Sequence, residues 1–474
     1  MQRDQLPACL SIDPASPEPR YRQLYQRVRE AIAAGVLRPG DRIPATRWLA
    51  QELGLARGTV AAAYALLAAE GCLETRGAAG AVVTAITARE LPGAQPRPNA
   101  RPGLPLDLGA GAPPLPFQMG VPALDQFPRK IWARLAARAA RATQPRHMLK
   151  ECAFGAPDLR CAIAAHLQLA RGMRCAPGQV FVTAGYRDTL TRIARVLLAP
   201  GQQVWTEDPG FPPTRHLLGA LGIEAVAVAV DGNGLDPAQG LALAPGARAA
   251  VLTPAHQAPL TVTLSTPRRR TLLDWAEANG AWLVEDDYDG EFRYAGKPPP
   301  ALASMDRAGR VLHSGSFSKM MFPGLRLAYL VVPPDLVERF ELDAATFGGG
   351  QPQLTQAIVL DFMQEGHFVR HIQRMRRLYG ERSALLRAAL LDAAGAHLAI
   401  DPQPGGMHLL ARTEAAADRA LAARLRALGM APQPLSPWYA GQARAGGLLL
   451  GFANVADAAQ AQALAARLAA ALED

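Results

Sequence analysis

The chain has 474 residues, of which 49% are hydrophobic, and it carries a formal net charge of +9. Its length suggests two or three domains, and no apolar run reaches the ~18 residues that span a membrane or forms the apolar stretch of a signal peptide. The five cysteines are odd in number and form no CxxC pair, which argues against a disulfide framework or a zinc site and favours a reducing cytoplasm.

Residues 1–17 read as a loose arm, and residues 18–85 read as a small domain of their own. Tyr21, Leu24, Val28 and Ile32 recur three or four residues apart, which predicts a first helix. The stretches PATRWLAQELGL and ARGTVAAAYALLAAEG then predict two short helices around a glycine-containing turn. CLETRGAAGAVVT follows as a hairpin with a glycine-rich tip. This order predicts an α+β winged helix-turn-helix.

The motifs LRPGDRIPATRWLAQELGLARGTVAAAY and LLAAEGCLETRG resemble the GntR family of winged-helix DNA-binding domains. The resemblance implies that a double-stranded DNA operator is contacted by Arg47, Arg57, Gly58, Thr59 and Gly77. Physical reasoning agrees, because side chains at the start of a recognition helix reach base edges while its backbone N–H groups meet phosphate. The alternative is a three-helix protein-binding module in which Arg57 is merely solvated. The wing tip GAAG departs from the usual turn of this family, so the resemblance is weaker at the wing than at the helices.

Residues 86–116 predict a linker. From residue 92 to residue 116 the sequence contains eight prolines together with several glycines. Such a stretch forms neither a helix nor a central strand and acts as a semi-rigid spacer. It marks the boundary between two domains.

Residues 117–370 predict a large α/β domain in which short apolar runs alternate with helices. Strands are expected at 179–183, 204–207, 225–230, 249–253 and 282–285, and helices at 189–198 and 268–279. This alternation predicts a largely parallel sheet covered on both faces, with ligands at the carboxyl ends of its strands. Residues 371–474 predict a smaller C-terminal α+β subdomain with helices at 371–394 and 456–472 and strands at 408–411 and 447–452.

One lysine stands out in the large domain. VLHSGSFSKMMFPGLRLAYLVVPP, residues 311–334, reads as strand, loop and strand, with Lys319 in the loop. Only four of the fifty basic residues are lysines. Arginine replaces lysine wherever a positive charge suffices, but it cannot lose its proton and attack a carbonyl. Lys319 is therefore a candidate Schiff-base lysine, and the alternative is a surface lysine in a turn.

SGSFSK followed by GLR resembles the cofactor-lysine segment of fold-type I enzymes that use pyridoxal 5'-phosphate (PLP). It is most similar to MocR/GabR-type regulators, in which an aminotransferase-like domain follows a GntR-type winged helix. The resemblance implies that Lys319 bonds covalently to PLP and that Ser316 and Arg326 hold its phosphate. It also implies that Asp286, in WLVEDDYDGEF, faces the pyridine nitrogen and that Tyr288 meets the ring's 3-oxygen. The alternative for these last two residues is a solvated acidic turn.

Three further segments carry the resemblance. TPAHQAP places His256 on the 3-oxygen side, where aminotransferases usually carry Asn, and EDPGF places Phe211 against the pyridine ring. TAGYRDTL supplies Gly185, Tyr186 and Arg187 to the turn that cups the phosphate. A structural histidine and a core phenylalanine are the alternatives for the first two.

The chain departs from the aminotransferase pattern in several places. Tyr186 and Arg187 replace a small hydroxyl residue and Gln, and KECAFG carries Lys150 where a Tyr is common. These changes either replace the usual phosphate donors with charge or alter the phosphate cup. In GLLLGF, Leu449 stands where aminotransferases carry the Arg that binds the substrate carboxylate. Arg444 or Arg215 is the candidate substitute.

The resemblance covers about 440 residues and implies a PLP-dependent transcriptional regulator. We expect a head-to-tail homodimer that binds an operator and senses PLP, a small amine or an amino acid. A catalytically active aminotransferase with a DNA-binding head is the main alternative. A third possibility is a regulator whose second domain has lost PLP and serves only for dimerisation, which the rarity of lysine argues against.

Overall fold

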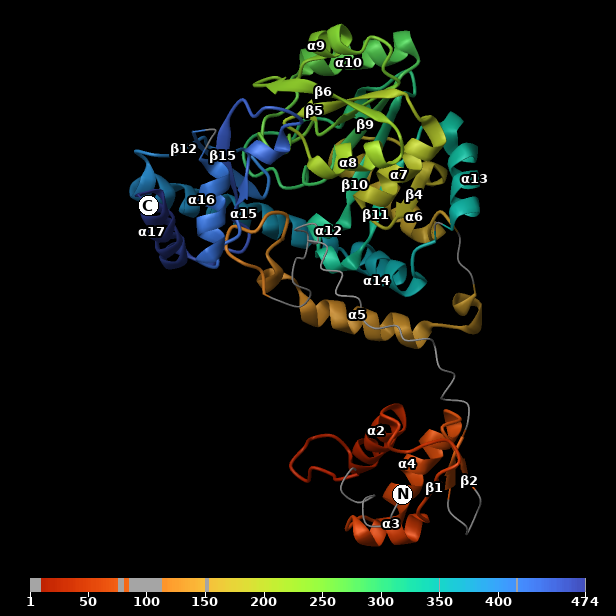
Figure 1. Ribbon diagram of the computed structural model, residues 1–474. Coiled ribbons are helices and arrows are strands. Elements are labelled where there is room, and N and C mark those ends of the chain that lie inside the picture. Colours follow the sequence, from red (N-terminus) through yellow and green to blue (C-terminus); the bar gives the residue numbers. More distant parts are fainter. Residues whose placement is uncertain are drawn as a thin grey trace. The chain divides into compact units, whose positions relative to one another are not determined.

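The computed structural model describes residues 10–75, 81–84, 113–149, 153–348, 350–414 and 417–473. The chain divides into two compact units, Met1–Ala110 and Gly111–Asp474 (Figure 1). Two residues singled out from the sequence, Gly77 and Lys150, lie outside the described residues, as do much of the predicted arm and linker. No helix in the described part of the chain has both the length and the apolarity to cross a membrane.

The first unit is a winged helix. It contains helices α2 (Arg20–Ala33), α3 (Thr46–Glu52) and α4 (Arg57–Ala69) and strands β1 (Arg42–Ile43), β2 (Leu73–Thr75) and β3 (Ala81–Val83). The strands form an antiparallel sheet in the order β1-β3-β2. Leu24, Val28, Val60 and Leu67 are fully buried in its core, as their helical spacing predicts. Tyr21 differs, because 38% of it remains exposed.

The second unit is built on an eight-stranded sheet in the order β4-β11-β10-β9-β8-β5-β6-β7. The strands are β4 (Val180–Thr183), β5 (Gln203–Asp208), β6 (Glu224–Asp231), β7 (Gly234–Leu235), β8 (Ala249–Leu252), β9 (Trp282–Asp287), β10 (Val311–Ser316) and β11 (Ala328–Val331). The strands from β10 across to β6 pair in parallel, whereas β11 runs antiparallel to both of its neighbours. The sheet is therefore largely parallel, as the alternating pattern predicts.

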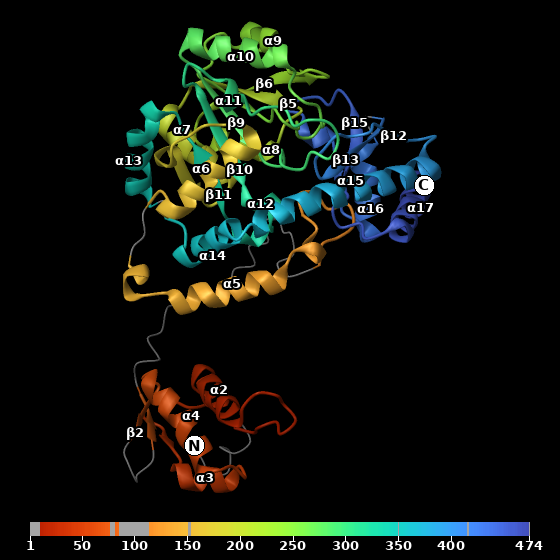
Figure 2. The same cartoon turned by 180° about the vertical axis from the view of Figure 1, so that it is seen from behind.

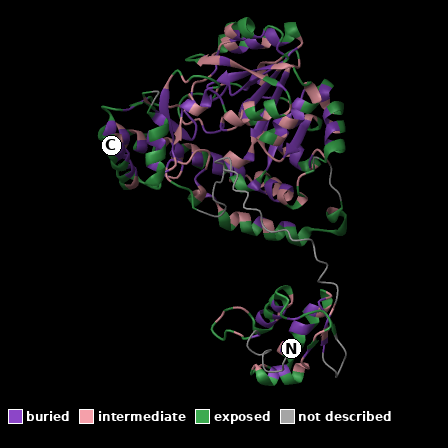
Figure 3. Ribbon diagram, viewed as in Figure 1, coloured by how far each residue is buried: buried purple, intermediate pink, exposed green. Residues whose placement is uncertain are grey.

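Helices cover both faces of this sheet (Figure 3). The helices of this part of the unit are α5 (Arg129–Ala142), α6 (Pro157–Arg171), α7 (Tyr186–Leu197), α8 (Pro212–Ala220), α9 (Pro237–Leu243), α10 (Thr266–Asn279), α11 (Leu302–Met305), α12 (Phe317–Met320), α13 (Val337–Phe347) and α14 (Gln353–Gln364). Among them, α5 packs on α14 and not on the sheet. Alternate residues of a strand enter different cores: Phe181 packs in the core that contains α7 and α13, whereas Val180 and Val182 pack in the core that contains α6. This two-sided burial explains why the strands read as continuous apolar runs.

The small subdomain has an antiparallel sheet in the order β12-β13-β15-β14. Its elements are α15 (His367–Ala394), β12 (Ala399–Ile400), β13 (His408–Thr413), α16 (Asp418–Ala427), β14 (Gln433–Pro434), β15 (Gly446–Gly451) and α17 (Ala458–Glu473). Figure 2 shows α15 running from the large sheet into this subdomain. The helix begins before the predicted boundary at residue 371. Phe117 also pairs with Gly451 of this subdomain, a long-range contact that has no local signal in the sequence.

Candidate functional site

Lys319 lies at the carboxyl end of β10, where the chain enters α12. The structure forms a one-turn helix here in place of the predicted loop, because the buried side chains of Phe317 and Met320 anchor it. The Lys319 Nζ atom donates a hydrogen bond to the Gly120 carbonyl at 2.7 Å. Burial lowers the pKa of Lys319, and the nearby carboxylates of Asp289 and Asp286 partly oppose that shift. A half-buried amine with a lowered pKa reaches the neutral, nucleophilic form more easily than a surface lysine.

Asp286 is buried at the end of the neighbouring strand β9. Burial raises the pKa of this carboxyl well above its usual range, and the like charges of Asp287, Asp289 and Glu207 raise it further, while Lys319 lowers it. A buried carboxyl with a raised pKa gains most from a cationic partner. Asp286 is therefore suited to face a ring nitrogen that carries a proton.

A histidine and a tyrosine extend the site on one side. The Nδ1 atom of His256 lies 3.0 Å from Oδ2 of Asp289 and 3.2 Å from the hydroxyl of Tyr288. These two contacts fix the orientation of the His256 ring. Among the described residues, the buried atoms His256 Nε2 and Asp289 Oδ1 have no hydrogen-bond partner. Such orphaned atoms are expected where a polar ligand completes the site.

The segment that was expected to cup a phosphate forms the first turn of α7. Gly185 precedes the helix with φ +122°, and a Cβ at this position would meet open space, so the approach to the helix N-terminus is clear. The Tyr186 hydroxyl bonds to Thr214 Oγ1 at 2.7 Å, and its ring stands 6.0 Å from that of Phe211. Tyr186 and Phe211 share a small hollow with Asp286. The structure thus brings these sequence-predicted residues together.

Two arginines from the sequence analysis carry unpaired charge. Arg326 has φ +51° after β10 and α12, and both Arg326 and Arg187 are exposed. Within the described residues neither guanidinium makes a hydrogen bond or an ion pair. Ser316 caps α12 by accepting a hydrogen bond from the Ser318 N–H at 3.3 Å. Free guanidinium and hydroxyl groups near a helix N-terminus are the donor types that a phosphate dianion needs.

The position of the missing carboxylate-binding arginine is apolar. Leu449 is fully buried on β15. Neither proposed substitute is free: the Arg215 guanidinium donates to the carbonyls of Gly210 and Trp438, and Arg444 pairs with Asp208 at 3.4 Å. Both arginines therefore already have partners in the structure, and Arg215 also lines the hollow that contains Asp286.

Sequence reasoning missed three residues of the site. Gly120 contacts Lys319 from a segment that has no motif of its own, and Asp289 orients His256. Glu207 lines the hollow beside Asp286, where burial raises its pKa to about 7 despite hydrogen bonds from Thr253. Glu207 lies in the EDPGF motif and Asp289 in the EDDYDGEF motif. The position of these motifs after predicted strands was the signal in the sequence that could have identified both acids.

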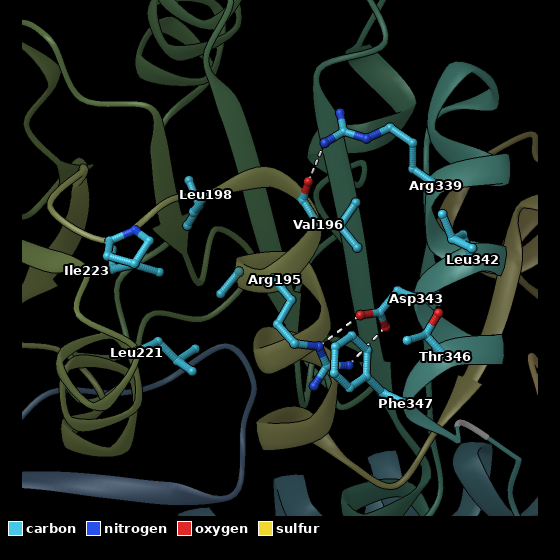
Figure 4. A pocket seen from close by; sticks show the side chains of 12 residues that line it. Arg195, Val196, Leu198, Leu221, Ile223, Arg339, Leu342, Asp343, Thr346 and Phe347 are labelled. Atoms are coloured by element: carbon cyan, nitrogen blue, oxygen red, sulfur yellow. Dashed lines mark hydrogen bonds and ion pairs between the residues drawn. The ribbon is translucent and has the colours of Figure 1, made fainter.

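A second hollow lies between α7 and α13 (Figure 4). Arg195 and Asp343 form a bidentate ion pair at 2.8 and 2.9 Å, and the Phe347 ring lies 4.3 Å from the Arg195 guanidinium. Arg339 donates to the Val196 carbonyl on the opposite side of the groove. None of the residues predicted to hold a cofactor lines this hollow. It is a separate feature of the surface.

In the winged-helix unit, Arg57 is the first residue of α4. Arg57 and Gly58 are exposed, Thr59 is half-buried, and Arg47 is exposed on α3. Among the described residues no side chain pairs with the guanidinium of Arg47 or Arg57. The buried residues Val60 and Tyr64 hold the opposite face of α4 against the core. The predicted contact residues therefore lie on the solvent side of the helix-turn-helix.

Comparison with known proteins agrees with this two-part architecture. Residues 20–83 match the family "Bacterial regulatory proteins, gntR family", and residues 108–458 match "Aminotransferase class I and II". The chain is 36% identical over 457 residues to the probable rhizopine catabolism regulatory protein MocR of Rhizobium meliloti, spanning 94% of this chain and 92% of that protein. This chain belongs to the MocR-type regulators of the gntR family. The predicted family is thereby confirmed.

Two further regulators are similar to this chain over most of their length. The HTH-type transcriptional regulator TauR of Rhodobacter capsulatus is 37% identical and spans 87% of this chain and 88% of its own. The pyridoxine biosynthesis transcriptional regulator PdxR of Corynebacterium glutamicum is 33% identical, with 94% of each chain covered. The similarity thus includes both units of the chain.

Solved structures resemble the second unit. Kynurenine aminotransferase of Pyrococcus horikoshii, in complex with PMP, has a TM-score of 0.69 and 22% identity over 77% of this chain and 92% of its own. LysN of Thermus thermophilus, an α-aminoadipate aminotransferase complexed with N-(5'-phosphopyridoxyl)-L-leucine, has a TM-score of 0.68 and 26% identity over 76% of this chain and 92% of its own. These likenesses confirm the predicted fold-type I domain.

Proposed function

We propose that this MocR-type protein is a transcriptional regulator whose winged helix binds an operator and whose aminotransferase-like unit holds PLP through Lys319. The observation that carries the proposal is the half-buried Lys319 amine, whose pKa is lowered, beside the buried Asp286 carboxyl. Bound PLP would supply an aldehyde carbon that bonds to primary amines and a ring that withdraws electrons. The regulator responds to PLP itself, to a small amine or to an amino acid at this site.

The surrounding residues have distinct roles in this proposal. Asp286 would keep the pyridine nitrogen of bound PLP protonated, while Tyr288 and His256 would hold its 3-oxygen. The N-terminus of α7, with its N-cap Gly185, would hold the phosphate together with Ser316, Arg326, Tyr186 and Arg187, and Phe211 would contact the ring.

The winged helix supplies the second half of the function. Arg57, Gly58 and Thr59 open α4 on its exposed side, where they enter a major groove, and Arg47 meets the phosphate backbone. Gly77 belongs to the wing tip and remains a predicted contact. A head-to-tail homodimer presents two such units to repeated half-sites. A cytoplasmic location is part of the same proposal.

A genuine aminotransferase is the competing function, because Lys319, Asp286 and Tyr288 are retained. Leu449 disfavours it, since turnover requires a clamp that aligns the substrate, and positioning contributes up to roughly 7–11 kcal/mol. Sensing needs only that an amine reaches the Lys319 site. We therefore favour regulation without sustained turnover.

One experiment tests both halves of the proposal. Purified protein should absorb visible light, and borohydride reduction should fix a pyridoxyl group on the Lys319 peptide. Affinity for a selected operator should then change when PLP or an amine is added, and Lys319→Ala should abolish that response. Label recovered on Lys150 or Lys297 would contradict the cofactor assignment. Sustained transamination of a common amino acid, with operator affinity unaffected by PLP or amines, would establish the aminotransferase function in place of regulation.

A further inference from the structure

Glu207 is a buried carboxyl whose hydrogen bonds all come from neutral donors. It lies near the end of β5, lines the hollow that also contains Asp286, and is only 7% exposed. Among the described residues no cation forms an ion pair with it. Burying such a group costs free energy unless neighbouring donors replace the water that it loses. The donors around Glu207 therefore show which part of the fold this carboxyl holds.

All of these donors belong to one segment, residues 253–258. The backbone N–H of Thr253 donates to Oε1 of Glu207 at 3.1 Å, and the Thr253 hydroxyl donates to Oε2 at 2.5 Å. The side-chain amide of Gln257 donates to Oε2 at 3.2 Å and also contacts two backbone carbonyls, each at 2.9 Å. The hydroxyl oxygen of Thr253 in turn accepts from the Ala258 N–H at 3.3 Å. Glu207 therefore holds both ends of this segment.

His256 lies between the two ends that Glu207 holds. Its Nδ1 atom is 3.0 Å from Oδ2 of Asp289 and 3.2 Å from the hydroxyl of Tyr288. The backbone of Gly406 approaches the imidazole so closely that an added Cβ would collide with the ring. The buried Nε2 atom has no hydrogen-bond partner within the described residues, which leaves it available to a ligand. The position of Nε2 therefore depends on how residues 253–258 are held.

We propose that Glu207 is a positioning residue of the cofactor site, which acts through Thr253 and Gln257 to fix the segment that carries His256. The inference rests on the proposed function and adds to it a residue outside the set that would hold PLP. An ionised carboxylate accepts hydrogen bonds at both oxygens, whereas an amide accepts at one oxygen and donates from its nitrogen. Glu207→Gln therefore keeps the shape of the side chain and loses at least one of its acceptor contacts to the segment.

A double-mutant cycle tests whether Glu207 acts through His256. PLP affinity is measured by absorbance titration for the wild type, Glu207→Gln, His256→Asn and the double variant. The measurements are made at about pH 8.5, where Glu207 is ionised, since burial raises its pKa only to about 7. Glu207→Gln should weaken PLP binding about tenfold in the wild-type background and less than about twofold in the His256→Asn background. Equal losses in the two backgrounds would overturn the inference, as would unchanged binding in the first.

The apoprotein gives a second measurement that needs no PLP. Protein labelled at its histidines is examined by NMR, and the His256 signal is the one missing from the His256→Asn spectrum. Glu207→Gln should shift this signal. Glu291→Gln is the matched control, because Glu291 is also 7% exposed but accepts hydrogen bonds from His166 and Arg376. It should shift the His166 signal and leave that of His256 in place. An unshifted His256 signal in Glu207→Gln would refute the positioning role.

A second variant decides the question if Glu207→Gln fails to fold. Thr253→Val keeps the size of the side chain and removes the hydroxyl that donates to Glu207. It should weaken PLP binding and shift the His256 signal in the same way, and wild-type behaviour in both measurements would overturn the inference. Absence of the borohydride label on Lys319 of the wild type would instead refute the proposed function. The histidine spectra of the apoprotein would still report on Glu207, so the two failures are distinguishable.

Discussion

Gly120 is the residue whose substitution tests the site most directly. It adopts φ +73°, and a Cβ added there would lie 2.5 Å from the Lys319 Nζ atom. Ordinary van der Waals contact begins at 3.4 Å, so Nζ would have to withdraw by about 0.9 Å. The lysine is the flexible partner in this contact and will move before the backbone does. Gly120→Ala should therefore displace the reactive amine while the fold persists.

The expected magnitudes separate the local effect from general strain. A left-handed backbone costs an alanine about 1–2 kcal/mol of folding free energy. A displacement of roughly 1 Å at a reacting group can cost about 100-fold in rate, so PLP should attach more slowly to the displaced amine. Because the bond to Lys319 holds the cofactor in this proposal, PLP affinity should also fall in Gly120→Ala. Gly172→Ala is the matched control, because Gly172 has φ +65° but a Cβ there meets nothing within 4 Å. It should lose similar stability and keep its PLP affinity.

Two measurements decide this prediction. PLP affinity is obtained from an absorbance titration of the apoprotein, and the free energy of unfolding is obtained from urea denaturation. We expect the two variants to match in stability and to differ in PLP affinity. If Gly120→Ala binds PLP as tightly as Gly172→Ala does, the lysine does not need the space above Gly120 and the reasoning is wrong.

Three further predictions concern other parts of the chain. Arg57→Ala should cost about 1–3 kcal/mol of specific operator binding. Arg47→Ala should weaken the binding of specific and non-specific DNA alike. If both variants bind the operator like the wild type in a titration at controlled salt, the contact assignment is wrong. Arg171→Met removes the ion-pair partner that lies 2.8 Å from the buried Asp287. The free energy of unfolding, measured by urea denaturation, should fall by about 3–5 kcal/mol. A loss below about 1 kcal/mol would show that the fold does not need this ion pair. Burial raises the pKa of Glu207 to about 7 from an ordinary 4.5, so the folded state holds a proton that the unfolded chain releases between those values. The folding stability that this proton on Glu207 contributes is fully present below about pH 4.5 and is lost as the pH rises to about 7. Glu207→Gln should therefore flatten this part of the plot of stability against pH. An unchanged plot would refute the assignment.

Much of the architecture was accessible from local pattern. The helical spacing of Leu24 and Val28 and the continuous apolar strands depend on neighbours within a few residues, so the sequence carries them directly. The scarcity of lysine singled out Lys319, and polar residues directly after strands singled out Asp286 and Tyr288. All three lie at the carboxyl edge of the sheet, as the rule for parallel sheets requires.

The sequence by itself therefore determined the two units, the sheet type and the family, and it singled out Lys319. Only the tertiary structure decided what surrounds that lysine. Gly120 contacts it across 199 positions of the chain, and Arg215 is bound to carbonyls more than 220 residues away. Neither contact has a local signature, because each depends on how separately folded segments pack. The same packing buries Leu449 among apolar side chains and closes the usual carboxylate position, a consequence of close-packed interiors that no strand pattern specifies.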